Sequence, residues 1–98
     1  MEVQGVIKLV REVQSLGEKG FLKRELIVET TGEYPQPIMI EFVQDKTSLL
    51  NDCSVGDSVT VAVNLRGREW TNAEGVVKYF NSIQGWKVTQ DKDANPLA

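Results

Sequence analysis

Residues 57–88 read DSVTVAVNLRGREWTNAEGVVKYFNSIQGWKV. From Val59 to Leu65 apolar side chains fall on every second residue, which is the period of a strand with one buried face. A loop with two arginines and Trp70 follows, and then a polar turn. A second strand rich in aromatic residues returns from Val76 to Val88. The stretch therefore predicts a long hairpin.

Upstream of this hairpin the pattern predicts three more strands. A first strand over residues 3–13 contains Gly5, which favours a bulge or a sharp coil. Glycine- and proline-containing turns are expected over 14–20 and 31–37, on either side of a second strand over 21–30. A third strand covers 38–43, and Asp45 opens a short helix over 45–53.

The element order is strand, strand, strand, short helix, strand, strand. This order predicts an all-β fold, a five-stranded OB-fold (Greek-key) barrel with the helix between strands 3 and 4. A five-stranded sandwich or an SH3-like barrel is the alternative. We expect one domain over residues 1–90 and a polar C-terminal tail over 91–98.

Composition narrows the class of function. The chain has 98 residues, 41% hydrophobic and 26% charged, with a formal net charge of −3. No apolar run approaches the roughly 20 residues of a membrane span, and the N-terminus lacks the features of a secretory signal, so we expect a cytoplasmic protein without membrane contact. Cys53 is the single cysteine, which leaves no internal disulfide and no metal site to build.

An enzyme is not expected. The chain has no histidine, which is the commonest general base and metal ligand. No phosphate-binding glycine loop is present, and Asp91 and Asp93 lie in the predicted tail. We therefore expect no catalytic residues and no cofactor.

Several segments resemble a known family. The sequence is similar to a small bacterial domain-of-unknown-function family that is related to single-stranded-DNA-binding OB proteins. The resemblance covers roughly residues 1–88 and is carried by residues 1–5, 25–30, 56–61, 68–70 and 79–87. These short motifs imply the OB fold more strongly than they imply an activity.

The predicted loop of the hairpin is the first candidate site. Arg66, Arg68 and Trp70 alternate, so in an extended segment they project to one side. Guanidinium groups bind phosphate, and an indole offers a plane on which bases stack. The alternative is structural: Trp70 would cap the barrel end, while the arginines would pair with Glu69 or Glu74.

The outer face of the second strand is the next candidate. There Phe21 and Lys23 would form a stacking platform, although the four acidic residues nearby would repel phosphate: Glu25, Glu29, Glu33 and Glu41. Alternatively, Phe21 and Ile27 would form a subunit contact.

The last strand adds Tyr79 and Lys87, which share a face opposite to Phe80 and Trp86 unless a bulge near Ser82 exchanges the faces. Phe80 and Trp86 are expected in the core or at the barrel end.

The sequence thus predicts binding of single-stranded nucleic acid, DNA before RNA, largely without sequence preference. Three cations would meet phosphates, namely Arg66, Arg68 and Lys23, and three aromatic residues would stack on bases, namely Trp70, Phe21 and Tyr79. A protein-interaction module that uses the same barrel face is the alternative, favoured by the acidic balance. Outward-facing apolar residues also predict a homo-oligomer, most simply a homodimer: Val6, Val10, Ile27, Met39 and Val43.

Overall fold

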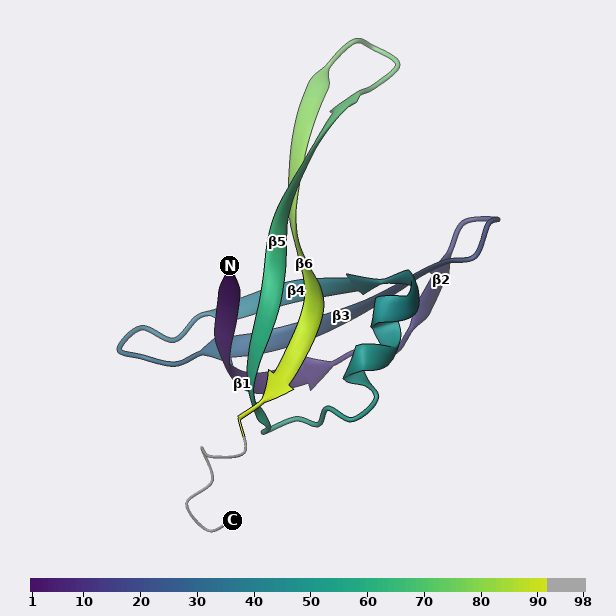
Figure 1. The fold of residues 1–98 in the computed structure, drawn as a ribbon. Helices are drawn as coiled ribbons and strands as arrows, with labels where there is room; N and C mark the ends of the chain where they lie inside the picture. Colours follow the sequence, from purple (N-terminus) through teal and green to yellow (C-terminus); the bar gives the residue numbers. More distant parts are fainter. Residues whose placement is uncertain (92–98) are drawn as a thin grey trace.

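Five strands close into a ring in the computed structural model, which describes residues 1–91 (Figure 1). The strands are β1 (Glu2–Val10), β3 (Phe21–Thr30), β4 (Pro37–Val43), β5 (Ser58–Thr71) and β6 (Val77–Gln90). Their order around the ring is β1–β5–β6–β4–β3, and β1 also pairs with β3. Every pairing is antiparallel except β4–β6, which is parallel at Glu41 and Gln84. The predicted OB fold is confirmed.

Gly5 allows β1 to pair with two neighbours. It lies opposite Thr30 of β3 and also opposite Val59 of β5. A Cβ atom on Gly5 would overlap the backbone carbonyl of Glu29, so the close approach of β1 and β3 requires glycine here. The irregularity in β1 is a register shift between Ile7 and Leu9, so the bulge lies beyond the glycine that suggested it.

The core fills the inside of the ring and agrees with the alternation of the sequence. On β5, Val59, Val61 and Val63 point inward and are fully buried or nearly so. They pack with six other buried residues: Ile7, Leu26, Val28, Ile40, Phe42 and Leu50. Each such apolar side chain stabilises the fold by about 1.5–3 kcal/mol relative to exposure.

A short 3₁₀ helix, η1 (Gln44–Leu50), covers one end of the barrel. It is shorter than the helix predicted over 45–53. Gln44 turns the chain with a positive φ of 54°, and Thr47 Oγ1 donates a hydrogen bond to the Gln44 carbonyl at 2.8 Å. Arg24 of β3 ties this end together, since its Nη1 donates to Asn51 Oδ1 at 2.9 Å.

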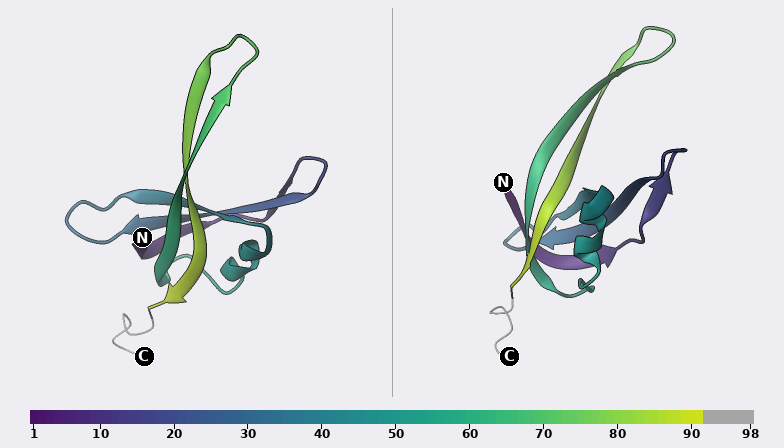
Figure 2. Two further views of the ribbon diagram at one scale, coloured as in Figure 1. Left: turned by 45° about the horizontal axis from the view of Figure 1, so that its top comes forward. Right: turned by 45° about the vertical axis from the view of Figure 1, so that its right-hand side comes forward.

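Residues 66–70, which were predicted as a loop with two arginines, form part of the strand β5. β5 and β6 have 14 residues each and pair along their whole length from Val59–Gln90 to Thr71–Val77. Beyond the barrel they continue as a twisted two-stranded arm (Figures 1 and 2). Leu65, predicted on the inner face, is 62% exposed because the arm has already left the barrel there.

The end of the first strand and the position of the bulge in the last strand also differ from the prediction. The first strand ends at Val10, and part of the predicted turn forms a separate strand, β2 (Gln14–Leu16), which pairs with the start of β3. The bulge of β6 lies at Trp86, where Ala62 pairs with Lys87 and Val63 with Gly85, and so not near Ser82. The predicted tail over 91–98 lies almost entirely outside the described residues.

Candidate nucleic-acid interface

The two faces of the arm differ in chemistry. Residues directly opposite each other in an antiparallel pair point to the same side. One side, which we call the groove face, carries the pairs Arg66–Ser82, Arg68–Phe80 and Trp70–Lys78. The other side, the back face, carries Leu65–Ile83, Gly67–Asn81, Glu69–Tyr79 and Thr71–Val77. The cations of the arm strands are therefore all on the groove face, and their acidic residue, Glu69, is on the back face.

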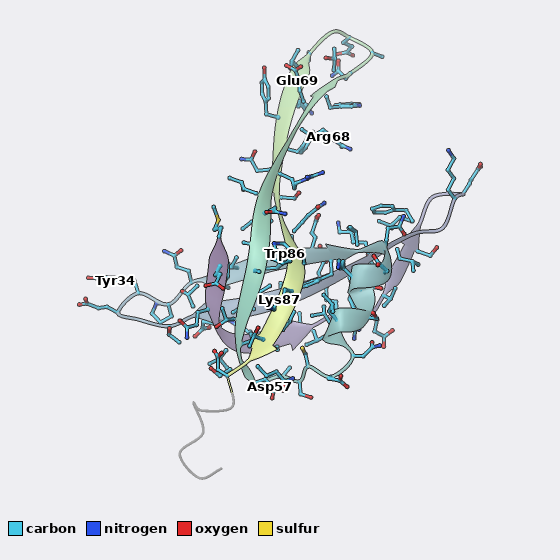
Figure 3. All side chains as sticks on the ribbon, viewed as in Figure 1. Tyr34, Asp57, Arg68, Glu69, Trp86 and Lys87 are labelled. Atoms are coloured by element: carbon cyan, nitrogen blue, oxygen red, sulfur yellow. The ribbon has the colours of Figure 1, made fainter. Side chains whose placement is uncertain are left out.

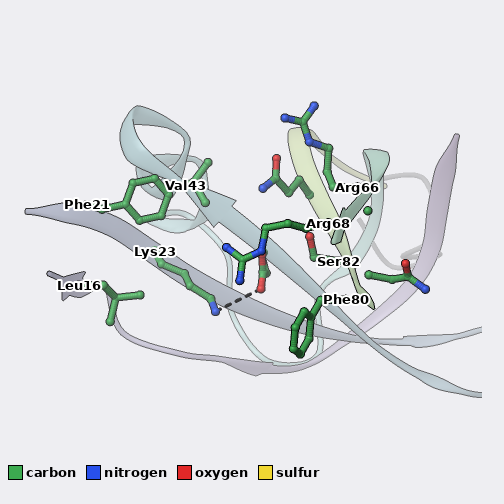
Figure 4. Close-up of a pocket in the computed structure, with 12 residues that line it drawn as sticks. Leu16, Phe21, Lys23, Val43, Arg66, Arg68, Phe80 and Ser82 are labelled. Atoms are coloured by element: carbon green, nitrogen blue, oxygen red, sulfur yellow. Dashed lines mark ion pairs between the residues drawn. The ribbon is translucent and has the colours of Figure 1, made fainter. Parts of the chain in front are cut away.

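A groove of about 680 Å³ lies between the arm and the strands β2, β3 and β4. The arm contributes Arg66, Arg68 and Phe80 to its lining, and β3 contributes Phe21 and Lys23; Arg68 points toward Lys23 in Figure 4. The remaining lining residues are Leu16, Glu41, Val43, Gly67, Asn81, Ser82 and Gln84. Residues about 45 positions apart in the sequence thus meet at one concave surface.

The two guanidinium groups of the arm are available to a ligand. Within residues 1–91, neither Arg66 nor Arg68 has a carboxylate oxygen within 4.0 Å. Arg68 Cζ lies 5.8 Å from the centroid of the Phe80 ring, a cation–π distance. This arrangement differs from the structural alternative, in which the arginines pair with Glu69 or Glu74.

Lys23 has a different environment, because it belongs to an ionic network that begins in the groove and extends beyond it. Its ammonium group lies 3.1 Å from Glu41 Oε1 and 3.7 Å from Glu25 Oε2. Arg11 Nε approaches the other oxygen of Glu25, Oε1, at 3.4 Å. Two of the four acidic residues expected near this strand, Glu25 and Glu41, flank Lys23, so its charge is less available to a phosphate than the charges of Arg66 and Arg68.

The structure brings together four of the seven candidate residues from the sequence: Phe21, Lys23, Arg66 and Arg68 all line the groove. Trp70 shares the groove face of the arm, nearer its tip, and is 47% exposed. Tyr79 lies on the back face opposite Glu69, away from the arginines. Lys87 lies on the barrel opposite Ala62, and it is exposed (Figure 3).

Sequence reasoning missed Phe80 and Lys78. Phe80 was expected in the core together with Trp86, but both side chains are 48% exposed. Lys78 lies directly opposite Trp70. Asn72 and Val76 close the turn of the hairpin with a backbone hydrogen bond of 3.0 Å. Pairing the two strands outward from this turn places Phe80 opposite Arg68, which is the signal that could have identified Phe80.

The described part of the chain shows neither a metal site nor a membrane-spanning helix. Residues 1–91 contain no cluster of three or more metal-ligating side chains. None of their helices is long and apolar enough to pass through a bilayer. Burial raises the pKa of the Cys53 thiol, and Asp57 and Asp52 act in the same direction, so this thiol is a poor nucleophile.

The fold and the groove define an OB barrel with an extended hairpin arm. The chain belongs to the family described as "Domain of unknown function (DUF3127)", which it matches over residues 2–89. This confirms the resemblance inferred from the sequence. No curated protein matches the chain.

Solved structures share the fold at low sequence identity. A small single-stranded DNA-binding protein from Streptomyces coelicolor is 17% identical, with a TM-score of 0.62, over 97% of this chain and 95% of that one. The mitochondrial single-stranded DNA-binding protein Rim1 from S. cerevisiae is 16% identical, with a TM-score of 0.55, over 94% of this chain and 93% of that one. At these identities the likeness establishes the fold.

Proposed function

We propose that this protein binds single-stranded nucleic acid, DNA before RNA, in the groove between the arm and β2–β4. The observation that carries the proposal is the groove face itself. It presents two guanidinium groups, on Arg66 and Arg68, without carboxylate partners in residues 1–91, beside the exposed ring of Phe80. The single-stranded DNA-binding proteins of the same fold support DNA over RNA.

The chemistry of the groove face suits a flexible polyanion. Arg66, Arg68 and Lys78 would contact phosphates, and every cation placed on a phosphate releases counterions. Phe80, Phe21 and Trp70 are 41–48% exposed and offer planes for unpaired bases. Stacking of this kind tolerates any base, since every base has an aromatic face.

The acidic balance of the chain does not oppose this mode of binding. The net charge of −3 is an average over the whole molecule, whereas binding depends on the local field. On the arm strands the single acidic side chain, Glu69, points away from the groove. A strand that follows the groove face therefore meets cations first.

Tryptophan fluorescence tests this proposal. The chain has two tryptophans, so a Trp86→Phe variant leaves Trp70 as the reporter. A mixed-sequence single-stranded oligodeoxynucleotide should quench Trp70 at micromolar concentration, and rising salt should weaken the binding steeply. Unchanged fluorescence, together with no shift in sedimentation at low salt, would contradict the proposal.

The back face of the arm favours a second function, contact with a protein partner, most simply another copy of the chain. Leu65, Val77 and Tyr79 are 62%, 44% and 74% exposed there. A two-stranded ribbon that leaves apolar side chains in water gains from being covered. Native mass spectrometry should detect a dimer that Leu65→Lys weakens, and a monomer across all concentrations would contradict this assignment.

The expected cytoplasmic location and the absence of catalysis stay predictions.

A further inference from the structure

Glu41 lies on the floor of the groove, beneath a surface that is otherwise suited to phosphate. It faces outward from β4 and is the residue that pairs with Gln84 of β6, where the arm leaves the barrel. Its side chain is 19% exposed. In Figure 4 the dashed line from Lys23 ends on this carboxylate, and Arg68 and Phe80 point into the same groove.

The two carboxylates that pair with Lys23 are not equivalent. Glu25 has a cation at each oxygen, with Arg11 at Oε1 and Lys23 at Oε2. Glu41 pairs only with Lys23, whose nearest approach is to Oε1. Apart from Lys23, no hydrogen-bond donor of the described residues contacts the Glu41 carboxylate, so this group keeps capacity to accept a bond from a ligand in the groove.

A phosphate is a poor occupant for that position. A carboxylate has no proton to donate at neutral pH and repels another anion. The arginines of the arm attract phosphates to the opposite wall. A nucleic acid strand in the groove would therefore lie with its backbone along the arm and its base edges toward Glu41.

We propose that Glu41 reads the amino group of the base, so that the groove prefers cytosine to thymine. This inference rests on the proposed function. Cytosine presents an N4 amino donor at the position where thymine presents the O4 acceptor, and a carboxylate accepts from the first and repels the second. Unpaired bases expose this edge, so it can be read in a single strand. The selectivity is modest, because stacking and phosphate contacts are shared by both bases.

Equilibrium binding of oligodeoxycytidine and oligothymidine of equal length, at neutral pH and low salt, tests this reading. The two pyrimidines stack similarly, so their ratio of affinities isolates the edge contact. The wild-type protein should favour oligodeoxycytidine by about three- to tenfold. Glu41→Gln should bring the ratio close to one, because an amide can accept from N4 or donate to O4.

Glu29→Gln is the matched control, since it removes one negative charge from β3 outside the groove, where Glu29 pairs with Lys8 at 3.6 Å. This variant should keep the wild-type ratio. A ligand change gives the same test without altering the protein: oligomers of N4,N4-dimethyldeoxycytidine have lost both amino donors and should bind like oligothymidine.

Equal or thymine-favouring affinities of the wild-type protein would overturn the inference while leaving the proposed function intact. A cytosine preference that survives both Glu41→Gln and N4 dimethylation would also overturn it. Failure to bind either oligomer at low salt would overturn the proposed function, and the role of Glu41 with it.

Discussion

Arg68 of β5 and Phe80 of β6 are direct partners across the arm, and the guanidinium carbon lies 5.8 Å from the centroid of the ring. The pair joins the two groups that a single strand needs, a fixed cation for phosphate and a plane for a base. Tyr79, the next residue along β6, points to the back face. The alternation of β6 therefore provides an internal comparison.

Phe80→Ala should weaken binding of a single-stranded oligonucleotide by about 5- to 100-fold, since it removes the ring on which one base would stack. Tyr79→Ala removes an aromatic ring from the opposite face and should change the affinity much less. Fluorescence anisotropy with a labelled oligonucleotide measures both. A larger loss of affinity from Tyr79→Ala than from Phe80→Ala would mean that the back face of the arm, rather than the groove face, binds the oligonucleotide.

Replacing Arg66 and Arg68 together by alanine should remove most binding and lower the salt dependence. Two lost phosphate contacts reduce the slope of log K against log salt by about 1.4 for a single strand. The melting temperature should change little, because neither side chain has an ion-pair partner in residues 1–91.

The matched control is the double variant Lys8→Ala with Lys46→Ala, which removes an equal number of positive charges from β1 and η1, outside the groove. It should bind almost as the wild type does. Equal losses in the two double variants would mean that net charge, rather than the groove, determines affinity.

Gly85 of β6 supports the barrel where the arm begins. A Cβ atom there would collide with the ring of Phe42, which is fully buried. Gly85→Ala should therefore lower the free energy of unfolding by about 1–3 kcal/mol. Gly67→Ala, in the arm, meets only Asn81 Oδ1 at 3.8 Å and should change it by less than about 0.5 kcal/mol. Urea unfolding compares the two, and a tolerated Gly85→Ala would refute the close contact.

The Cys53 thiol should react slowly in the folded protein. Burial raises its pKa, so at mildly alkaline pH less reactive thiolate is present than in the unfolded chain. Iodoacetamide should label the urea-unfolded protein faster than the folded one. Because the folded state favours the protonated thiol, the stability it contributes is present below the ordinary thiol pKa and is lost as pH rises through the folded value. Cys53→Ser should lack this part of the pH dependence, and equal labelling rates would contradict the shift.

The strand order and most of the core followed from the sequence because alternation identifies inward residues wherever the sheet has one buried face. Val59, Val61 and Val63 are examples. Leu65 continues the same alternation yet lies in water, since the pattern does not reveal where a strand leaves the barrel. Phe80 was misplaced for a related reason: large aromatic residues are usually buried, but an arm with two exposed faces has no interior to receive them. Trp86 is exposed at the bulge of β6, where it has no partner on β5.

The candidate site was predicted in part. The groove lined by Arg66, Arg68, Phe21 and Lys23 forms because β6 pairs with β4 at the base of the arm, and β4 pairs with β3. The pairing of Lys23 with Glu41 depends on the register of β3 against β4, which sequence alternation leaves undefined, whereas Glu25 lies two residues from Lys23 on the same strand. The same register places Glu25 directly opposite Glu41.

Chemical-shift mapping by NMR tests the central claim most directly. On titration with a single-stranded oligodeoxynucleotide, changes in backbone amide shifts should concentrate at residues 21–23, 66–70 and 78–82, while η1 and the loop around Tyr34 should stay unchanged. Shifts confined to η1 or the Tyr34 loop, or no shifts at saturating oligonucleotide and low salt, would contradict binding in the groove.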